Sequence, residues 1–121
     1  MSSVNASECL TIDGVTIIRP SAEHSSLFEN VLDSVGLTAD IAKSLSSPRL
    51  IVDLCNVKFV GSAFLGRCIL LQRVLQERDG GRFALANMNS FCAAGFSVAK
   101  LDTVLAIYPT TTDALSALKG Q

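Results

Sequence analysis

The sequence predicts a single α/β domain built on a mixed, mostly parallel β-sheet. A short apolar run, Leu50–Leu54, is typical of a strand that is covered on both faces. Helix-like and strand-like segments alternate after it, and such alternation favours crossover connections between parallel strands. Near the N-terminus, Asp13-Gly14 separates two apolar segments, which indicates a tight hairpin and one antiparallel strand pair. A chain of 121 residues has room for one such domain.

The N-terminal half is expected to contain two hairpin strands, a helix that is interrupted near Gly36, and the apolar strand. Pro20-Ser21 ends the second hairpin strand, and Ser46-Ser47-Pro48 closes the helix. The bounds that the pattern indicates are Leu10–Ile12 and Val15–Ile18 for the hairpin, Glu23–Val35 and Thr38–Leu45 for the two parts of the helix, and Leu50–Leu54 for the apolar strand.

The C-terminal half alternates helices and strands and ends on a helix. Asp79-Gly80-Gly81 stops the first of these helices with glycines suited to a left-handed cap. The expected N-caps are Ser62, Ser90, and Thr111 or Thr112. The predicted elements are Ser62–Arg78, Arg82–Ala86, Ser90–Ala99, Val104–Ile107, and a last helix from Thr111 or Thr112 to Leu118. The order is ββαβαβαβα with about four helices, residues 9–121 forming the domain and residues 1–8 a loose segment.

Composition and charge exclude several classes of partner and site. Charged residues make up 17% of the chain and the formal net charge is −1, so there is no basic footprint for nucleic acid or anionic lipid. The apolar stretches are far shorter than a membrane span and the start lacks the layout of a secretory signal, so we expect a cytoplasmic protein without direct membrane insertion.

The single histidine, His24, is expected at the surface, and we expect no metal site and no cofactor. The isolated cysteines are expected to be mostly small buried side chains: Cys9, Cys55, Cys68 and Cys92.

Ser62 is the main candidate for a functional side chain. It lies where the loop after the apolar strand gives way to a long amphipathic helix. The first N–H groups of that helix and its dipole would favour a phosphate on this side chain. Two interpretations stay open: Ser62 caps the helix, or Ser62 is a regulatory phosphorylation site. Since serine is among the preferred residues at the N-cap position, the spacing alone favours capping.

The segment around Ser62 resembles the signature of STAS domains, the modules of anti-sigma-factor antagonists. The residues that carry the resemblance are Ile51-Val52-Asp53-Leu54, Phe59-Val60 and Gly61-Ser62-Ala63-Phe64-Leu65-Gly66. It continues through Gly80-Gly81-Arg82-Phe83-Ala84-Leu85-Ala86, Leu101 and Thr112-Asp113-Ala114-Leu115, and spans roughly residues 10 to 118. Ser62 falls on the serine that such antagonists have phosphorylated.

The resemblance implies a regulatory protein-binding module without catalytic activity. Its unphosphorylated form would bind an anti-sigma factor that is also a serine kinase with an ATPase-kinase fold, and thereby release the sigma factor. Phosphorylation of Ser62 would then weaken the complex, because a phosphate brings close to two negative charges into the interface. The resemblance leaves a homodimer open. The residues expected at the partner surface are Gly61, Ser62, Ala63, Phe64, Arg67, Lys58 and Ser21.

Several positions depart from the family pattern. Gly61 stands where the family carries Asp, Ala63 replaces a hydroxyl residue, and Phe64 replaces a glycine. Arg19-Pro20-Ser21-Ala22 stands where members tend to show Gly-x-Leu-Asp, and Lys100 stands where a glycine is usual. These departures keep a second function open, a phosphorylation-independent STAS scaffold that serves as a subunit of a signalling assembly or of a lipid transporter.

Phe64 is expected to be partly exposed, because Leu65 already points along the apolar stripe of the helix. An exposed aromatic ring beside Ser62 would mark an interface. Arg67 and Lys58 are either phosphate ligands for Ser62 or ordinary solvated charges.

Asp53, at the end of the apolar strand, is expected to make hydrogen bonds to the following loop. An enzyme that uses Ser62 or a cysteine as nucleophile is the least favoured function, because the only histidine is distant in sequence. Gly61-Ser62-Ala63 also lacks the Gly-x-Ser-x-Gly pattern of a nucleophile elbow.

Overall fold

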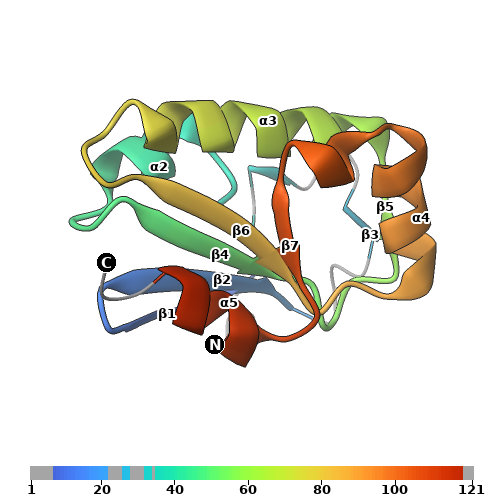
Figure 1. Cartoon of the computed structure of the whole chain (residues 1–121), viewed down its shortest axis with the longest axis horizontal. Coiled ribbons are helices and arrows are strands. Elements are labelled where there is room, and N and C mark those ends of the chain that lie inside the picture. Colours follow the sequence, from blue (N-terminus) through green and yellow to red (C-terminus); the bar gives the residue numbers. More distant parts are fainter. Residues whose placement is uncertain (1–6, 22–25, 28–31, 34, 119–121) are drawn as a thin grey trace, which may run out of the picture.

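The computed structural model describes residues 7–21, 26–27, 32–33 and 35–118. Its main feature is a five-stranded sheet with the strand order β1-β2-β4-β6-β7 (Figure 1). The antiparallel pair is β1 with β2, and every other neighbouring pair in this sheet is parallel. The predicted mixed, mostly parallel sheet is therefore confirmed. The strands are β1 (Ser7–Ile12), β2 (Val15–Pro20), β4 (Arg49–Asp53), β6 (Arg82–Ala86) and β7 (Ala106–Tyr108).

The N-terminal hairpin turns at the predicted dipeptide. Asp13 and Gly14 have φ values of 53° and 79°, and a two-residue turn that follows the twist of its strands needs positive φ at both positions. The strand β1 starts earlier than predicted, since Ser7 and Glu8 pair with the end of β2. These two residues are not part of a loose segment, because β2 runs on to Pro20 and offers them backbone partners.

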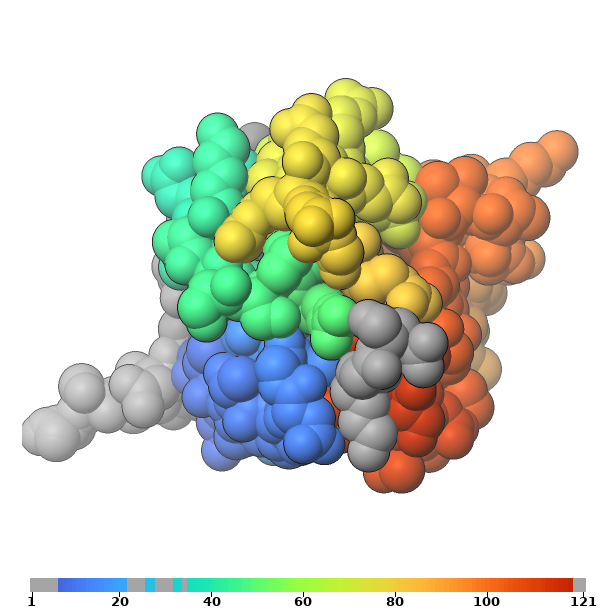
Figure 2. Space-filling model, turned by 60° about the vertical axis from the view of Figure 1, so that its left-hand side comes forward, coloured from blue at the N-terminus to red at the C-terminus, as the bar shows by residue number. Residues whose placement is uncertain are grey.

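Helices cover both faces of the sheet. In Figure 1, α2 (Ala39–Ser44) and α3 (Ser62–Gln76) lie over one face, and α5 (Thr111–Leu118) lies over the other. Figure 2 shows the same division from the side, with the hairpin and α5 in the lower half and α2 and the end of α3 in the upper half. Alternate residues of β4 enter two apolar clusters, Leu50 and Val52 on the α3 face and Ile51 on the α5 face. This double burial explains the unbroken apolar run in the sequence.

Two very short strands lie outside the predicted pattern. β3 (Ser26–Leu27) and β5 (Phe59–Val60) pair in parallel and form a separate two-stranded sheet just before α3. β3 lies inside the predicted helix Glu23–Val35, so that prediction is wrong at Ser26–Leu27, where the backbone pairs with β5 instead. At Phe59–Val60 the sequence predicts a loop, because a two-residue strand carries no usable hydrophobic period. The small sheet has a consequence for the site, because it leads the chain directly into the first turn of α3.

The predicted N-caps are each wrong by one residue or more. The N-caps of α3 and α4 (Ser90–Val98) are Gly61 and Asn89, both with extended backbone, in place of Ser62 and Ser90. Before α5, the Thr110 side chain takes the capping role in place of Thr111 or Thr112. The Asn89 side chain accepts from the Cys92 N–H at 2.7 Å, and the Thr110 hydroxyl accepts from the Asp113 N–H at 3.1 Å. For α2 the cap is Thr38, the first residue of the predicted helix. Each helix is otherwise close to its predicted range.

Left-handed backbone also occurs at Gly36, Gly80 and Lys100. Gly36 and Gly80, with φ values of 85° and 76°, confirm the predicted interruption and the predicted glycine stop. Lys100, directly before the 3-10 helix η2 (Leu101–Thr103), has a φ of 62°. The STAS pattern carries a glycine at this position, and the backbone keeps the conformation that glycine favours.

Most of the predicted helix Glu23–Val35, with His24, lies outside the described residues, as do residues 1–6 of the N-terminal segment. Among the helices that the structure describes, none is both long and apolar enough to cross a membrane.

Candidate functional site

Ser62 is exposed and is the first residue of α3. Gly61, not Ser62, is the N-cap, because the Gly61 N–H donates to the Leu27 carbonyl and anchors the chain at the end of the small sheet. The Gly61 carbonyl then accepts from the Phe64 and Leu65 N–H groups at 3.0 and 3.3 Å, which starts the helix. No side chain caps this end, so the Ser62 hydroxyl is not committed to the helix start. A group on Ser62 would lie at the positive end of a 15-residue helix.

Phe64 is completely buried, so the prediction that its ring is partly exposed is wrong. The ring stacks on Phe96 of α4, with centroids 6.1 Å apart and an interplanar angle of 27°. The error arises because α4 packs over the start of α3 and brings its own aromatic side chain to Phe64, a contact that the spacing in α3 alone does not reveal. Phe64 therefore joins two helices and contributes no exposed surface to a partner.

The exposed aromatic pair near Ser62 consists of Phe59 and Phe91. Their side chains are 47% and 64% exposed, and the rings meet edge to face with centroids 5.5 Å apart. Phe59 lies on β5 and Phe91 in the first turn of α4. Sequence reasoning missed this pair, although both are aromatic residues close to a predicted element boundary.

Arg67 does not point toward Ser62. Its guanidinium forms an ion pair with Asp33 at 2.9 Å and donates to the Leu37 carbonyl. Arg67 lies five residues after Ser62, so the two side chains leave α3 on different faces. The Arg67 guanidinium already has two partners in this structure, whereas Lys58 is exposed; a phosphate role stays a prediction for both.

The remaining predicted surface residues differ in access. Gly61 and Ala63 are half-buried beside Ser62. The Ser21 hydroxyl oxygen is buried and has no hydrogen-bond partner among the described residues. Ser21 is thus a weak candidate for direct contact with a partner through its hydroxyl group.

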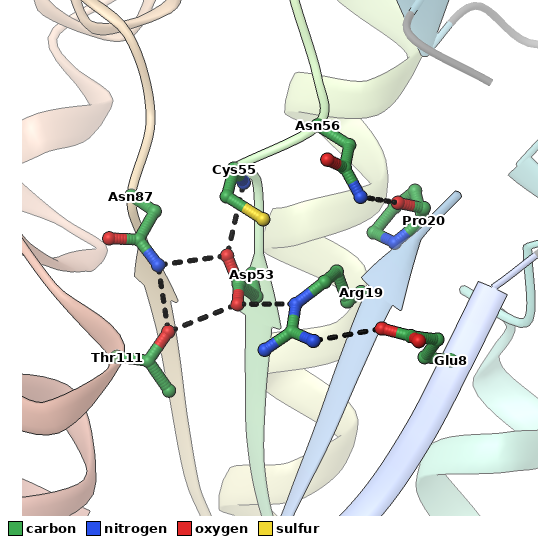
Figure 3. Close-up of polar contacts among 8 residues, drawn as sticks. All are labelled: Glu8, Arg19, Pro20, Asp53, Cys55, Asn56, Asn87 and Thr111. Atoms are coloured by element: carbon green, nitrogen blue, oxygen red, sulfur yellow. Dashed lines mark hydrogen bonds and ion pairs between the residues drawn. The ribbon is translucent and has the colours of Figure 1, made fainter. Parts of the chain in front are cut away.

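A buried polar network lies beneath the loop that leads to Ser62 (Figure 3). Asp53, 1% exposed, ends β4 and accepts through both carboxylate oxygens. Oδ1 accepts from the Cys55 N–H at 3.0 Å and from Asn87 Nδ2 at 2.9 Å. Oδ2 accepts from Arg19 Nε at 2.8 Å and from the Thr111 hydroxyl at 3.1 Å. The expectation that Asp53 bonds the following loop is confirmed, and the same carboxylate also joins β2, the residue directly after β6, and the first residue of α5.

The network explains the ionisation of its members. Burial would raise the pKa of Asp53, but the hydrogen bonds from Asn87, Arg19, the Cys55 N–H and Thr111 outweigh it and lower that pKa. The hydrogen bonds of Arg19 to Asp53 and Glu8 raise the pKa of its guanidinium, which is charged in any case. Asp53 and Arg19 therefore form an ion pair, and Asn87, Thr111 and the Cys55 N–H are neutral donors to the carboxylate. Together these contacts stabilise the ionised form of Asp53.

The loop between β4 and β5 is held from both sides. Asn56 Nδ2 donates to the Pro20 carbonyl at 3.2 Å, and the Leu54 N–H donates to the Ala86 carbonyl at 2.9 Å. On the other side, Asn89 Nδ2 lies 3.3 Å from the Lys58 carbonyl. The loop thus presents Ser62 from a restrained backbone.

Three of the four thiols, those of Cys55, Cys68 and Cys92, do not have the features of reactive nucleophiles. Burial raises the pKa values of Cys68 and Cys92, and burial together with the neighbouring Asp53 carboxylate raises the pKa of Cys55. Among the described residues, no group of three or more histidine, cysteine, aspartate or glutamate side chains is placed to hold a metal ion.

Comparisons with known proteins agree in fold. No family model matches the chain, and no curated protein matches its sequence. Its structure is similar to that of an anti-sigma-factor antagonist (STAS) domain protein from Planctomyces limnophilus, with 27% identity and a TM-score of 0.82 over 93% of this chain and 97% of that one. It is also similar in fold to an anti-sigma factor antagonist from Mycobacterium paratuberculosis, with 22% identity and a TM-score of 0.78 over 98% of both chains. The β-hairpin, the parallel strands and the helix that starts at Ser62 therefore form a STAS-domain fold.

Proposed function

We propose that the chain is a regulatory protein-binding module of the anti-sigma-factor antagonist kind, acting in the cytoplasm and controlling transcription through an anti-sigma factor that is also a serine kinase. The observation that carries the proposal is the exposed Ser62 at the first position of α3, in a fold shared with such antagonists. The proposal includes no catalytic activity and no cofactor.

Phosphorylation of Ser62 is the proposed switch. The phosphate would be tolerated by its own helix, because the N–H groups and the dipole at the start of α3 favour negative charge. It would oppose a partner that contacts the same surface, since close to two charges must then be desolvated in the interface. The restrained loop before Ser62 supports a local effect, because Asp53 and Asn89 hold that loop whether or not the phosphate is present. Affinity would therefore change while the fold does not.

A matched pair of serines allows a sharp test. Ser62 and Ser90 are both exposed first residues of a helix, and each follows a different residue as N-cap. The purified chain is incubated with ATP and each anti-sigma serine kinase of the host, and phosphate is located by mass spectrometry. We expect one phosphate, absent from Ser62→Ala and retained in Ser90→Ala. Phosphate that persists in Ser62→Ala, or no transfer by any of these kinases, contradicts the proposal.

A specific observation supports a second candidate. The first turn of α3 contains no acidic residue, since Gly61 and Ala63 flank the serine, and the departures from the family's motif bear on kinase recognition. A phosphorylation-independent STAS scaffold, in a signalling assembly or a lipid transporter, would need none of those features. It predicts a constitutive partner and no phosphate on Ser62 in cells. Phosphoserine analysis of the protein isolated from its host separates the two candidates.

A further inference from the structure

The helix α4 is apolar on two sides, and the domain covers only one of them. Cys92 and Phe96 are completely buried and pack into the main core. A second apolar stripe follows the helical spacing i, i+3, i+4, i+7. Its outer members, Phe91 and Val98, are 64% and 84% exposed. The members of this outer stripe are Phe91, Ala94, Gly95 and Val98.

The outer stripe forms one wall of an apolar groove against the start of α3. Val60 and Leu65, which flank Ser62 in the chain, form the other wall, and the cavity has a volume of 440 Å³. Figure 1 shows α4 beside the N-terminal end of α3. The described residues that line the groove include no charged side chain, and the contact of Phe91 with Phe59 extends the apolar surface beyond it.

The shape of the groove favours a helix as its occupant. An extended peptide would need an open strand edge with which to pair its backbone. The strand residue in the described lining, Val60, belongs to a two-residue strand, which is too short to offer such an edge. A helix satisfies its own backbone hydrogen bonds and needs only apolar contacts from the groove. Ala94 and Gly95 in the middle of the stripe allow a second helix to approach closely.

The charges around the groove favour acidic residues on that helix. Lys58 precedes the lining residue Val60 by two positions, and Lys100 directly follows the lining residue Ala99. Both lysines are exposed, and the positive end of α3 lies on the same side as Val60. The nearest acidic residue beyond this end of α4, Asp102, lies two residues past Lys100 in η2. Among the described residues that flank the lining in the chain, the two lysines therefore favour a partner with acidic side chains.

We propose that this groove binds an amphipathic helix of a protein partner, with apolar anchors at i, i+3, i+4 and i+7 and acidic residues beside them. The inference rests on the proposed function in one respect, that the helix belongs to the partner that recognises Ser62. It also gives the switch a mechanism, because Ser62 lies in the chain between the lining residues Val60 and Leu65, and a phosphate on it would repel the acidic flank of the helix.

A synthetic helix tests the groove directly. The probe is a fluorescent peptide of about four helical turns with leucines at i, i+3, i+4 and i+7 and glutamates beside them; a second peptide carries lysines in place of the glutamates. Anisotropy is measured with the wild-type chain, with Val98→Glu, and with Val104→Glu, since Val104 is 54% exposed and lies outside the lining. Thermal melting shows whether each variant is folded.

We expect saturable binding of the acidic peptide, at least tenfold weaker binding of the basic peptide, and a loss of roughly 30-fold in Val98→Glu but not in Val104→Glu. Equal binding of both peptides, no saturable binding, or equal affinity of the two variants overturns the proposal. So does sedimentation that shows self-association of the wild type lost in Val98→Glu, because a second copy would then be the occupant. None of these measurements uses a kinase or Ser62, so a failure here is distinct from a failure of the proposed function.

Discussion

Replacement of Asp53 by asparagine tests whether the buried network holds the domain together. The carboxylate accepts at both oxygens, and each oxygen has a pair of donors. An asparagine side chain keeps one oxygen and presents an NH₂ group in place of the other. If the remaining oxygen serves the Cys55 N–H and Asn87, the new NH₂ group faces Arg19 Nε, which is itself a donor. The opposite orientation sets the NH₂ group against the Cys55 N–H and Asn87 instead.

The expected loss of stability follows from these contacts. Either orientation loses at least one short bond to the carboxylate and leaves a donor without an acceptor at a site that is 1% exposed. Removing one partner of a buried ion pair costs about 3–5 kcal/mol, and Arg19, whose side chain is 30% exposed, recovers some hydration. We therefore expect Asp53→Asn to lower the free energy of unfolding by about 3 kcal/mol. This is a large part of the about 5–15 kcal/mol that is usual for a domain.

Urea unfolding followed by circular dichroism measures the effect. Glu8→Gln is the matched control, because it removes the exposed ion pair of the same arginine and should cost less than about 1 kcal/mol. Because folding lowers the pKa of Asp53, the contribution of its carboxylate is present above the ordinary aspartate pKa of about 3.9 and is lost as the pH falls through the lower value of the folded state. The difference in the free energy of unfolding between wild type and Asp53→Asn should therefore become smaller as the pH falls through that range. An Asp53→Asn chain within about 1 kcal/mol of wild type at neutral pH would refute the reasoning.

Three further predictions concern packing, backbone and thiol chemistry. Phe64→Ala should lower the free energy of unfolding by about 3–5 kcal/mol in urea titrations, because the ring is completely buried against Phe96; a loss below about 1 kcal/mol would contradict its place in the core. Lys100→Gly should raise that free energy by about 0.5–1 kcal/mol, because the backbone there is left-handed, and a destabilised variant would argue against this conformation. A colorimetric thiol reagent should label two cysteines in the native chain and all four in urea, and labelling of a buried thiol in the native chain would contradict the fold. The exposed pair is Cys9 and Cys55, and the buried pair is Cys68 and Cys92.

The architecture was predictable where a pattern repeats along the chain. The apolar run at β4 and the Asp13-Gly14 turn each have a direct physical meaning, and the structure shows both as expected. The two-residue strands β3 and β5 were not predictable, because pairing of two residues is decided by contacts distant in sequence. The N-caps of α3 and α4 were missed by one residue for a related reason, since the residue before each serine has extended backbone and takes the capping position.

The site was predictable only in part. Ser62 was found from its position at the start of a helix, and Asp53 from its position at the end of a strand. The contact of Phe64 with Phe96 could not be predicted, because it depends on how α4 packs over α3. The partners of Asp53 likewise come from β2, from the end of β6 and from the start of α5. Only the three-dimensional fold brings these side chains together.

The exposed apolar stripe of α4 was not predicted, for a different reason. Phe91 and Val98 were visible in the sequence as apolar residues of a predicted helix, and an apolar residue in a helix is usually assigned to the core. The structure separates the two stripes, because Cys92 and Phe96 are the fully buried residues of α4 and face the core. The helix has more apolar residues than one core-facing stripe can hold, and a count of these positions would have indicated a second, exposed stripe.

The measurement that tests the central claim most directly is the affinity of the chain for its cognate anti-sigma serine kinase, determined by calorimetry for matched variants. We predict that the wild type and Ser62→Ala bind alike, that Ser62→Asp binds roughly a hundredfold more weakly, a difference of about 2.7 kcal/mol, and that Ser90→Asp binds as the wild type does. Equal affinity of Ser62→Asp and the wild type would contradict a switch at Ser62 and would favour the phosphorylation-independent scaffold.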